Sequence, residues 1–328
     1  MTLQFSGPPR FPVSEGDHHP ERRTSVHVIV TCANRKSMPI PSHLQLGEVP
    51  GSSAIERART WIARLADTDS APQVPALDLY AGEHWSVARK FKDHERTGEE
   101  IRLWACSAGY GLIPAEARIM PYHATLTPNQ ADSVPCDAAS WWRWLNEWPG
   151  PAPEYPRSIR ALVASDPAAV FIFVLSKNYL RACGDDIVAS SGHISAPDRL
   201  LIVSAGARLQ GDLAAFAVPA DARLQAQFSG TRRALNARIG AHLLSAGIRG
   251  RGEATANLTQ LLAAQPPIPR YDRKKQTDRE ILDLIAQHLL QTPATSANRL
   301  LREFRDAGLA CEQHRFSRLY RTAAEATS

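Results

Sequence analysis

The segments Val170–Ser176 (VFIFVLS) and Leu200–Ala205 (LLIVSA) are nearly continuous runs of apolar residues. Such runs are typical of strands that are buried on both faces, because helices cover both sides of a parallel sheet. Two further segments, Val26–Ala33 and Ile101–Ala108, are similarly rich in apolar, β-branched or aromatic residues. We therefore predict an α/β fold in which these segments form one mostly parallel sheet flanked by helices.

Helical patterns of apolar residues separate these strands. We expect helices over Ser53–Ala66, His84–His94, Ala138–Trp148, Arg157–Ala164 and Ala222–Leu244. Alternation of strands with helices indicates β–α–β units with right-handed crossovers. The short segment Leu77–Tyr80 fits either a further strand or the lead-in to a helix.

Changes in composition divide the chain into four parts. Residues 1–24 are polar and proline-rich, and they lack the apolar segment of a secretory signal, so we expect a disordered leader. Residues 25–246 hold the α/β domain, and residues 247–271, which contain glycine, arginine and proline, form a linker. Residues 272–328 are expected to form a small all-α module, either trihelical or winged-helix, with helices over Asp278–Gln291, Ser296–Ala307 and Glu312–Ala324.

Composition excludes several classes of protein. No run approaches the roughly 18 apolar residues that span a bilayer, so we expect a cytoplasmic protein with no membrane partner. The 5 cysteines are scattered without a C-x-x-C pair, which argues against a disulfide framework and a thiolate zinc site. Without a histidine metal signature either, we predict no metal and no cofactor. The net charge of +5 only mildly favours polyanionic partners.

Each predicted strand ends in small, polar or nucleophilic residues, which include Cys32, Ser107, Ser176 and Ser204. The carboxyl ends of parallel strands share one edge of a sheet, and ligands bind in the crevice outside that edge. We therefore expect these residues to meet at one site. The alternative is that small residues simply suit the turn from strand to loop.

The segment Thr31–Lys36, with the sequence TCANRK, places a cysteine beside two cations at the end of the first strand. Nearby cations stabilise the thiolate, which is the nucleophilic form of cysteine. A partly desolvated lysine has a lowered pKa and can itself take part in chemistry. We expect Cys32 and Lys36 to be catalytic; the alternative is a structural cysteine beside a basic surface turn.

Loops that follow the strands supply aromatic, hydroxyl and basic side chains for binding a substrate. The expected substrate-binding residues are Asn34, Arg35, Tyr80, Trp85, Ser107, Tyr110, Tyr122, Ser176, Lys177 and Thr231. The glycines on either side of Tyr110 match neither a dinucleotide fingerprint nor a Walker loop. Such a turn could still present backbone N–H groups to an anion.

Four motifs together resemble the superfamily of the peroxide-stress protein YaaA. They are C-x-x-x-K at Cys32–Lys36, LYxGxxW at Leu79–Trp85, S-A-x-Y-G-L-I at Ser107–Ile113 and P-Y-x-x-T-L at Pro121–Leu126. The resemblance covers roughly residues 26–126. It implies an association with DNA, because relatives of YaaA are associated with DNA binding.

A looser similarity is to archaeosine synthase, in which a cysteine and a lysine precede a proline-containing stretch and a histidine. The corresponding run here is Cys32, Lys36, Pro39, Pro41, Ser42 and His43, with Ser-Met after the lysine in place of Pro-Tyr. In that family the lysine attacks the nitrile of a 7-cyano-7-deazaguanine base in tRNA. The resemblance implies similar chemistry at Lys36.

Three functions remain open at this point. The leading hypothesis is a nucleic-acid-directed enzyme that acts on a 7-deazaguanine-type base, with DNA preferred over RNA as the partner. The alternative is a non-catalytic DNA-binding stress or phage-defence protein. The third is a glycosidase or nuclease on modified nucleic acid, for which the chain offers only the carboxylate pairs Asp185–Asp186 and Glu99–Glu100.

The C-terminal module carries the expected contacts to nucleic acid. Its arginines would lie on phosphates and base edges, as in helix-turn-helix units; they are Arg299, Arg302, Arg315, Arg318 and Arg321. Acidic Glu303, Asp306 and Glu312 are interleaved with them. The alternative is therefore a protein-docking module with a solvated basic face.

Overall fold

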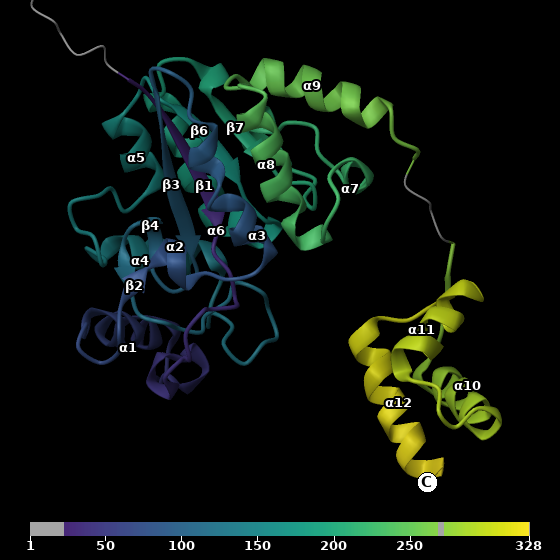
Figure 1. Ribbon diagram of the computed structural model, residues 1–328. Helices are drawn as coiled ribbons and strands as arrows, with labels where there is room; N and C mark the ends of the chain where they lie inside the picture. The colour runs from purple at the N-terminus through teal and green to yellow at the C-terminus, as the bar shows by residue number, and fades with distance from the viewer. Residues whose placement is uncertain (1–22, 268–271, 328) are drawn as a thin grey trace, which may run out of the picture. The chain divides into compact units, whose positions relative to one another are not determined.

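The computed structural model describes residues 23–267 and 272–327 (Figure 1). The chain forms two compact units that divide between Pro266 and Pro267. Of the leader expected over residues 1–24, all but the last two residues lie outside the described part. Thr24 already belongs to the first strand.

The first unit is built on a sheet of five strands in the order β4-β3-β1-β6-β7. The strands are β1 (Thr24–Thr31), β3 (Glu99–Ser107), β4 (Gly111–Pro114), β6 (Val170–Val174) and β7 (Leu200–Val203). The pairs β1–β3, β1–β6 and β6–β7 are parallel, and β4 is antiparallel to β3. The predicted α/β fold with a mostly parallel sheet is therefore confirmed.

Burial explains why the apolar runs form strands of this sheet, including β7 at its edge. All residues of β6 and β7 are buried, as are Val26, Val28, Ile29 and Val30 in β1. Strand β4 was not predicted, because its four residues follow directly on a glycine turn. Ile113 of β4 pairs with Ala105 of β3 and is likewise buried.

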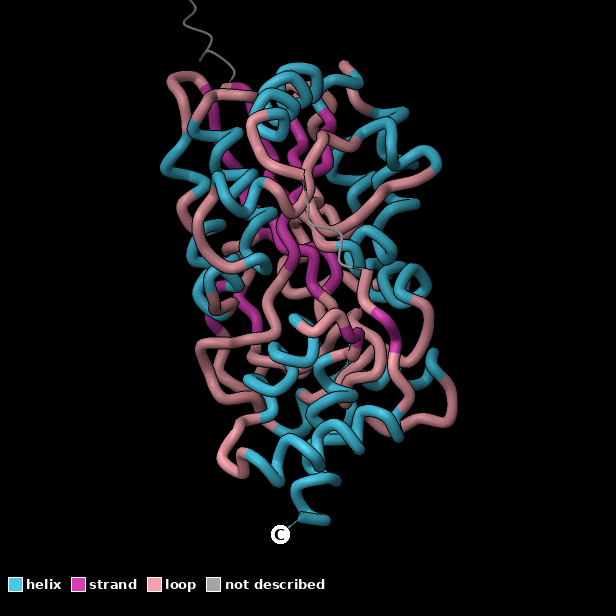
Figure 2. Tube along the Cα trace, turned by 90° about the vertical axis from the view of Figure 1, so that its right-hand side faces the viewer, coloured by secondary structure: helices cyan, strands magenta, loops and turns pink. Residues whose placement is uncertain are grey.

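Helices cover both faces of this sheet. They are α1 (Ala54–Ala66), α2 (Ala76–Leu79), α3 (Glu83–Ala88), α4 (Ala138–Glu147), α5 (Ile159–Ser165), α6 (Lys177–Ser190), α7 (Leu224–Gln227), α8 (Leu235–Ser245) and α9 (Arg251–Ala263). In Figure 1, α4 and α5 lie on one side of the strands, and α8 and α9 lie on the other. Figure 2 shows the strands in magenta running between the cyan helices. A short antiparallel pair, β2 (Val74–Pro75) with β5 (Arg118–Ile119), lies outside the main sheet.

The structure differs from the sequence prediction in three helices. The helix expected over Ala222–Leu244 is interrupted at Gly230, which has φ +125° and packs against the ion pair of Glu83 and Arg238. Helix α6 was not predicted, because its buried face includes the small or polar Cys183, Gly184 and Ser190 rather than a clear apolar stripe. The expected helix over His84–His94 is split into α3 and a short 3₁₀ turn.

The structure also differs from the linker expected over residues 247–271. Helix α9 occupies most of it, and its Ala254, Leu258 and Leu262 are buried in the core of the first unit. The observed division between the units therefore follows α9 instead of preceding it.

The second unit has its own small core. It contains α10 (Asp278–Gln291), α11 (Ala297–Asp306) and α12 (Gln313–Thr327), with Ile281, Phe304 and Phe316 among the buried residues. The two-residue strands β8 (Lys274–Lys275) and β9 (Leu309–Ala310) pair in parallel. Within residues 272–327 there is no antiparallel hairpin that could form a wing, so the trihelical alternative describes this unit. Across both described ranges, no helix is long and apolar enough to cross a membrane.

Candidate active site

The ends of four parallel strands lie at one edge of the sheet, as the sequence predicts. Thr31 is level with Cys106, and Val174 is level with Val203. Cys32, Ser107, Ser176 and Ser204 stand at or directly after these strand ends. The backbone N–H of Cys32 donates to the carbonyl of Cys106 at 2.9 Å, which fixes the first turn beyond the strand.

The sulfur of Cys32 is half-buried between two phenol groups. The hydroxyl of Tyr179 lies 2.9 Å from it, and the hydroxyl of Tyr122 donates to it at 3.5 Å. Tyr179 comes from the first turn of α6, which follows the neighbouring strand β6. Burial and the nearby Cys32 raise the pKa of both tyrosines well above its ordinary value. Both phenols therefore stay protonated and can donate to a thiolate.

Lys36 turns back over the same aromatic surface. Its Nζ donates to the carbonyl oxygens of Ala33 at 2.6 Å and Asn34 at 3.3 Å, and it lies 4.2 Å from the centre of the Tyr122 ring. Burial lowers the pKa of Lys36 from 10.5 to about 8, and the neighbouring Cys32 opposes this shift. An amine with such a pKa can exchange a proton near neutral pH.

A chain of hydroxyl groups lies beneath Cys32 and Lys36. Ser107 Oγ is 2.7 Å from the Tyr122 hydroxyl, which is 3.0 Å from the Tyr80 hydroxyl. Ser107 Oγ also accepts from the backbone N–H groups of Gly109 at 3.1 Å and Tyr110 at 2.9 Å. With its acceptor positions used, Ser107 directs its own proton to Tyr122. The Tyr122 proton is then available to Tyr80 or to the sulfur.

Several residues that were expected to contact substrate lie inside the protein and not at its surface. Tyr80, Trp85, Ser107, Tyr110 and Tyr122 are fully buried. Their polar atoms are used inside the protein, since Trp85 Nε1 donates to the Thr31 carbonyl at 3.0 Å and the Tyr110 hydroxyl accepts from Met120 N at 3.2 Å. These side chains position Cys32 and Lys36 from below.

The remaining expected binding residues lie on the outer side of the same edge. Asn34, Arg35, Lys177 and Thr231 are exposed. Ser176 is half-buried, and its backbone N–H donates to Thr31 Oγ1 at 3.0 Å. Thr231 is held by its backbone N–H, which donates to Glu83 Oε2 at 3.0 Å.

His84 belongs to this edge but was not among the predicted site residues. Its ring interacts with the Thr31 carbonyl, and its Nε2 is buried without a hydrogen-bond partner in the described part of the chain. Burial lowers the pKa of His84 to about 4, so the ring is neutral. The sequence signal for this residue is its place in the LYAGEHW motif, between Tyr80 and Trp85.

The glycine turn after β3 supports the site and uses its N–H groups within the protein instead of presenting them to an anion. The N–H groups of Gly109 and Tyr110 are already taken by Ser107. A Cβ on Gly109 would lie 2.5 Å from the Tyr122 ring, so the turn packs directly on that tyrosine. Arg157, which the sequence did not indicate, donates to the carbonyls of Tyr110, Leu112, Leu145 and Trp148 and so ties the turn to the end of α4.

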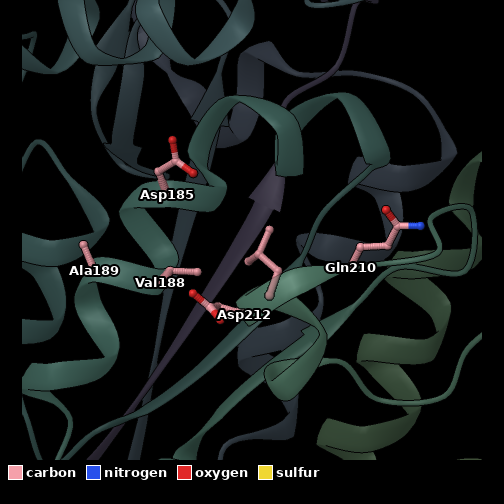
Figure 3. A pocket seen from close by; sticks show the side chains of 6 residues that line it. Asp185, Val188, Ala189, Gln210 and Asp212 are labelled. Carbon is pink, nitrogen blue, oxygen red and sulfur yellow. The ribbon is translucent and has the colours of Figure 1, made fainter.

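Among the cavities of the described residues, two in the first unit have volumes of about 330 Å³ each. One is lined by acidic Asp185 and Asp212 together with Val188 and Gln210. It lies where α6 faces the segment that follows β7 (Figure 3). Neither this cavity nor the next is lined by Cys32, Lys36 or the tyrosines around the sulfur. The other lies between the loop after Tyr122 and the first turns of α4 and α6.

Within residues 23–267 and 272–327, no group of three histidine, cysteine or carboxylate side chains could hold a metal ion.

Three of the arginines expected to contact nucleic acid are engaged inside the second unit. Arg315 and Arg318 pair with Asp278, and Arg299 pairs with Glu303 at 3.0 Å. Arg302 and Arg321 are exposed and make no ion pair with any described residue. They are the two predicted contacts whose charge remains fully available.

Comparisons with protein-family models, curated proteins and solved structures find no match to this chain. The chemical interpretation of the site therefore rests on the geometry of Cys32, Lys36 and the tyrosines around them.

Proposed function

We propose that this chain is a nucleic-acid-directed enzyme that acts on a 7-deazaguanine-type base by covalent addition of Cys32 to a nitrile. One observation carries the proposal: a half-buried thiol lies between two phenol donors, beside a lysine whose pKa is lowered to about 8. A nucleophilic cysteine needs groups that stabilise its thiolate and a nearby group that moves a proton. A purely structural cysteine needs neither.

The proposed reaction begins with attack of the Cys32 thiolate on the nitrile carbon. A carbon–sulfur bond forms, one π bond of the nitrile breaks, and the nitrogen takes a proton from the Lys36 ammonium. The product is a thioimide. An amine co-substrate then adds to the thioimide carbon and expels the Cys32 thiolate, which leaves an amidine on the base. Loss of the extra proton from the added amine to neutral Lys36 restores the starting state.

The surrounding side chains have separate roles in this proposal. Tyr179 and Tyr122 donate to the thiolate, and they keep their protons because burial raises the pKa of each. Ser107 and Tyr80 fix the direction of the Tyr122 hydroxyl. In the second unit, the exposed Arg302 and Arg321 would bind phosphates of the polynucleotide, with DNA as the favoured partner.

Mass spectrometry of the intact protein tests the covalent step. Wild-type protein incubated with an oligodeoxynucleotide that contains 7-cyano-7-deazaguanine, without added amine, should gain the mass of a thioimide adduct. Cys32→Ser should form none, and Lys36→Ala should form it at least tenfold more slowly. Both variants should keep the wild-type melting temperature. Absence of any adduct on the wild-type protein, with DNA or with the matching RNA, overturns the proposal.

The non-catalytic DNA-binding function is the second candidate. It is favoured by the two hydrogen bonds from Lys36 to backbone carbonyls, which would suit a lysine that only holds the turn after β1. Salt-dependent DNA binding without any adduct would select it. The nuclease hypothesis has less support, because Asp186 accepts from the backbone N–H groups at the start of α5 and Glu99 pairs with Arg249.

A further inference from the structure

The cavity between the loop after Tyr122 and the starts of α4 and α6 is lined in part by the two segments that supply the neighbours of the Cys32 sulfur. One wall is the loop that begins after Tyr122 and includes Leu126 and Thr127, and the other is the first turn of α6. Asn178 joins the walls, because its Nδ2 donates to Thr127 Oγ1 at 3.2 Å. The next residue, Tyr179, lies against Cys32. The cavity therefore lies at the same edge of the sheet as the thiol.

The lining of this cavity combines apolar surface with donors and acceptors that are not used elsewhere. Leu126, Val134 and Ala138 supply apolar contact. Arg181 is exposed and pairs with no carboxylate in the described ranges, so its guanidinium can donate. The Oδ1 atom of Asn178 likewise accepts no hydrogen bond there, since only its Nδ2 is engaged.

Asp137 supplies a carboxylate at the same wall. One of its oxygens accepts from the backbone N–H of Ser140 at 2.8 Å, which begins α4. This hydrogen bond lowers the pKa of Asp137, so the group is ionised at neutral pH. The Ser140 side chain and the Ala139 backbone also interact with this carboxylate. Because the two oxygens of a carboxylate offer about four acceptor positions, the group can still accept from a ligand.

From this geometry we infer that the cavity binds the guanine-type edge of a single flat base. A volume of about 330 Å³ is at the small end of ligand cavities and suits one bicyclic ring rather than a polymer. The carboxylate of Asp137 is matched to the adjacent N–H donors of a guanine edge, and Arg181 is matched to its carbonyl oxygen. This inference rests on the proposed function and names the part of the protein that selects the base, which would enter after leaving the nucleic-acid stack.

The acidic cavity in Figure 3 provides a matched control. Asp212 lines that cavity, just as Asp137 lines the proposed base-binding cavity. Asp137→Asn keeps a residue that can still begin α4, since asparagine caps helices as well as aspartate does, but it removes the charge. Asp212→Asn makes the same change at the other cavity. Arg181→Gln removes the guanidinium from an exposed position.

Calorimetric titration with guanosine and adenosine tests the inference. Guanosine has no nitrile, so its binding reports on recognition and not on the chemistry of Cys32. Wild-type and Asp212→Asn proteins should bind guanosine equally and at least tenfold more tightly than adenosine. Asp137→Asn and Arg181→Gln should weaken guanosine binding at least tenfold, with unchanged melting temperatures.

The outcomes separate this inference from the proposed function. Equal binding of the two nucleosides, or wild-type affinity in both cavity variants, overturns the inference. If the wild-type protein forms the thioimide adduct but does not bind guanosine, the inference fails and the proposed function stands. If guanosine binds as expected but no adduct ever forms, the cavity assignment stands and the covalent chemistry fails.

Discussion

The hydroxyl of Tyr179 lies 2.9 Å from the sulfur of Cys32, although 147 residues separate them in the chain. The contact exists because β6 pairs with β1 in parallel and α6 begins directly after β6. A helix that starts at the carboxyl edge of a sheet presents its first turn to the end of the neighbouring strand. Here the first turn of α6 carries a phenol that remains protonated and can stabilise a thiolate.

Replacement of Tyr179 by phenylalanine should therefore lower the reactivity of Cys32. Hydrogen bonds to charged groups contribute roughly 1.5–3 kcal/mol, so losing this one should slow alkylation by iodoacetamide at pH 7.5 about tenfold or more. The rate should be followed by mass spectrometry of the Cys32 peptide. Tyr155→Phe is the control, because Tyr155 is 44% exposed and is not one of the tyrosines that surround Cys32. Equal rates for both variants would show that the phenol does not support the thiolate.

The sequence predicted the sheet well because its strongest signal is burial on both faces. The apolar runs of β6 and β7 identified a parallel sheet, and the residues after the strand ends identified one edge. Cys32 and Lys36 stand out locally, since a cysteine beside two cations needs no tertiary information. The motifs around Tyr80, Ser107 and Tyr122 also meet beneath them.

Other parts of the site depend on tertiary contacts that leave no local pattern. Tyr179 was not among the predicted site residues, although its neighbours Ser176 and Lys177 were, because helix α6 has no clear apolar stripe that shows which way its first turn faces. Arg157 begins a helix that the sequence predicted, but the local pattern does not show that its side chain reaches four carbonyls. The burial of Tyr80 and Tyr110 also could not be inferred, because an aromatic residue near a strand end suits either a pocket wall or a core.

The lowered pKa of Lys36 gives the proposed reaction a defined pH dependence. If Lys36 donates a proton to the nitrile nitrogen, adduct formation should fall as pH rises through about 8, where the ammonium loses its proton. Lys36→Arg keeps a charged donor to much higher pH, so any activity it retains should lack this decline. Rates should be measured from pH 6.5 to 10 with the nitrile oligonucleotide. An identical alkaline decline in Lys36→Arg would exclude Lys36 as the proton donor.

The same shift predicts that Lys36 does not stabilise the protein. A pKa lowered from 10.5 to about 8 means that the buried ammonium is disfavoured by about 3 kcal/mol at neutral pH. Lys36→Met keeps the apolar stem over Tyr122 and removes the charge, so thermal unfolding should occur at the wild-type temperature or above it. A marked fall in melting temperature would instead support a structural role for its bonds to the Ala33 and Asn34 carbonyls.

Gly109→Ala should disturb the site through packing alone. The backbone of Gly109 is not in the left-handed region, but the new Cβ would lie 2.5 Å from the ring of fully buried Tyr122. Overpacking of this kind costs roughly 1–3 kcal/mol, and it would displace the hydroxyl that donates to Cys32. Gly192→Ala is the matched control, because its Cβ would meet nothing within 4 Å. Chemical denaturation and Cys32 alkylation should both change only for Gly109→Ala.

Acid should destabilise the first unit partly through His27. The Trp104 indole N–H donates to His27 Nδ1 at 2.9 Å, so Nε2 carries the proton and faces Asp166 Oδ2 at 3.3 Å. Burial lowers the pKa of His27 below 6.5, and the folded state therefore favours the neutral ring. Its contribution is present above about pH 6.5 and is lost as pH falls through the lowered pKa.

The free energy of unfolding at pH 7.5 and pH 5.5 measures this contribution. The loss of stability between the two pH values should be smaller in His27→Gln, whose amide can still accept from Trp104 but does not titrate. His84, whose pKa is lowered to about 4, contributes in the same direction, so some acid sensitivity should remain. An unchanged pH dependence in His27→Gln would contradict the expectation.

The exposed arginines of the second unit should set the salt dependence of DNA binding. Arg302 and Arg321 make no ion pair in the described chain, whereas Arg315 is held by Asp278 and by the carbonyl of Gln276. Each arginine that neutralises a phosphate contributes about one to the slope of log affinity against log salt. Arg302→Gln and Arg321→Gln should each reduce that slope by about one.

Arg208→Gln is the control, because it removes an equal charge at an exposed site of the first unit. It should leave the slope unchanged. Fluorescence anisotropy from 50 to 300 mM salt gives the slopes, and equal effects from all three changes would assign DNA binding to overall charge instead of to this unit.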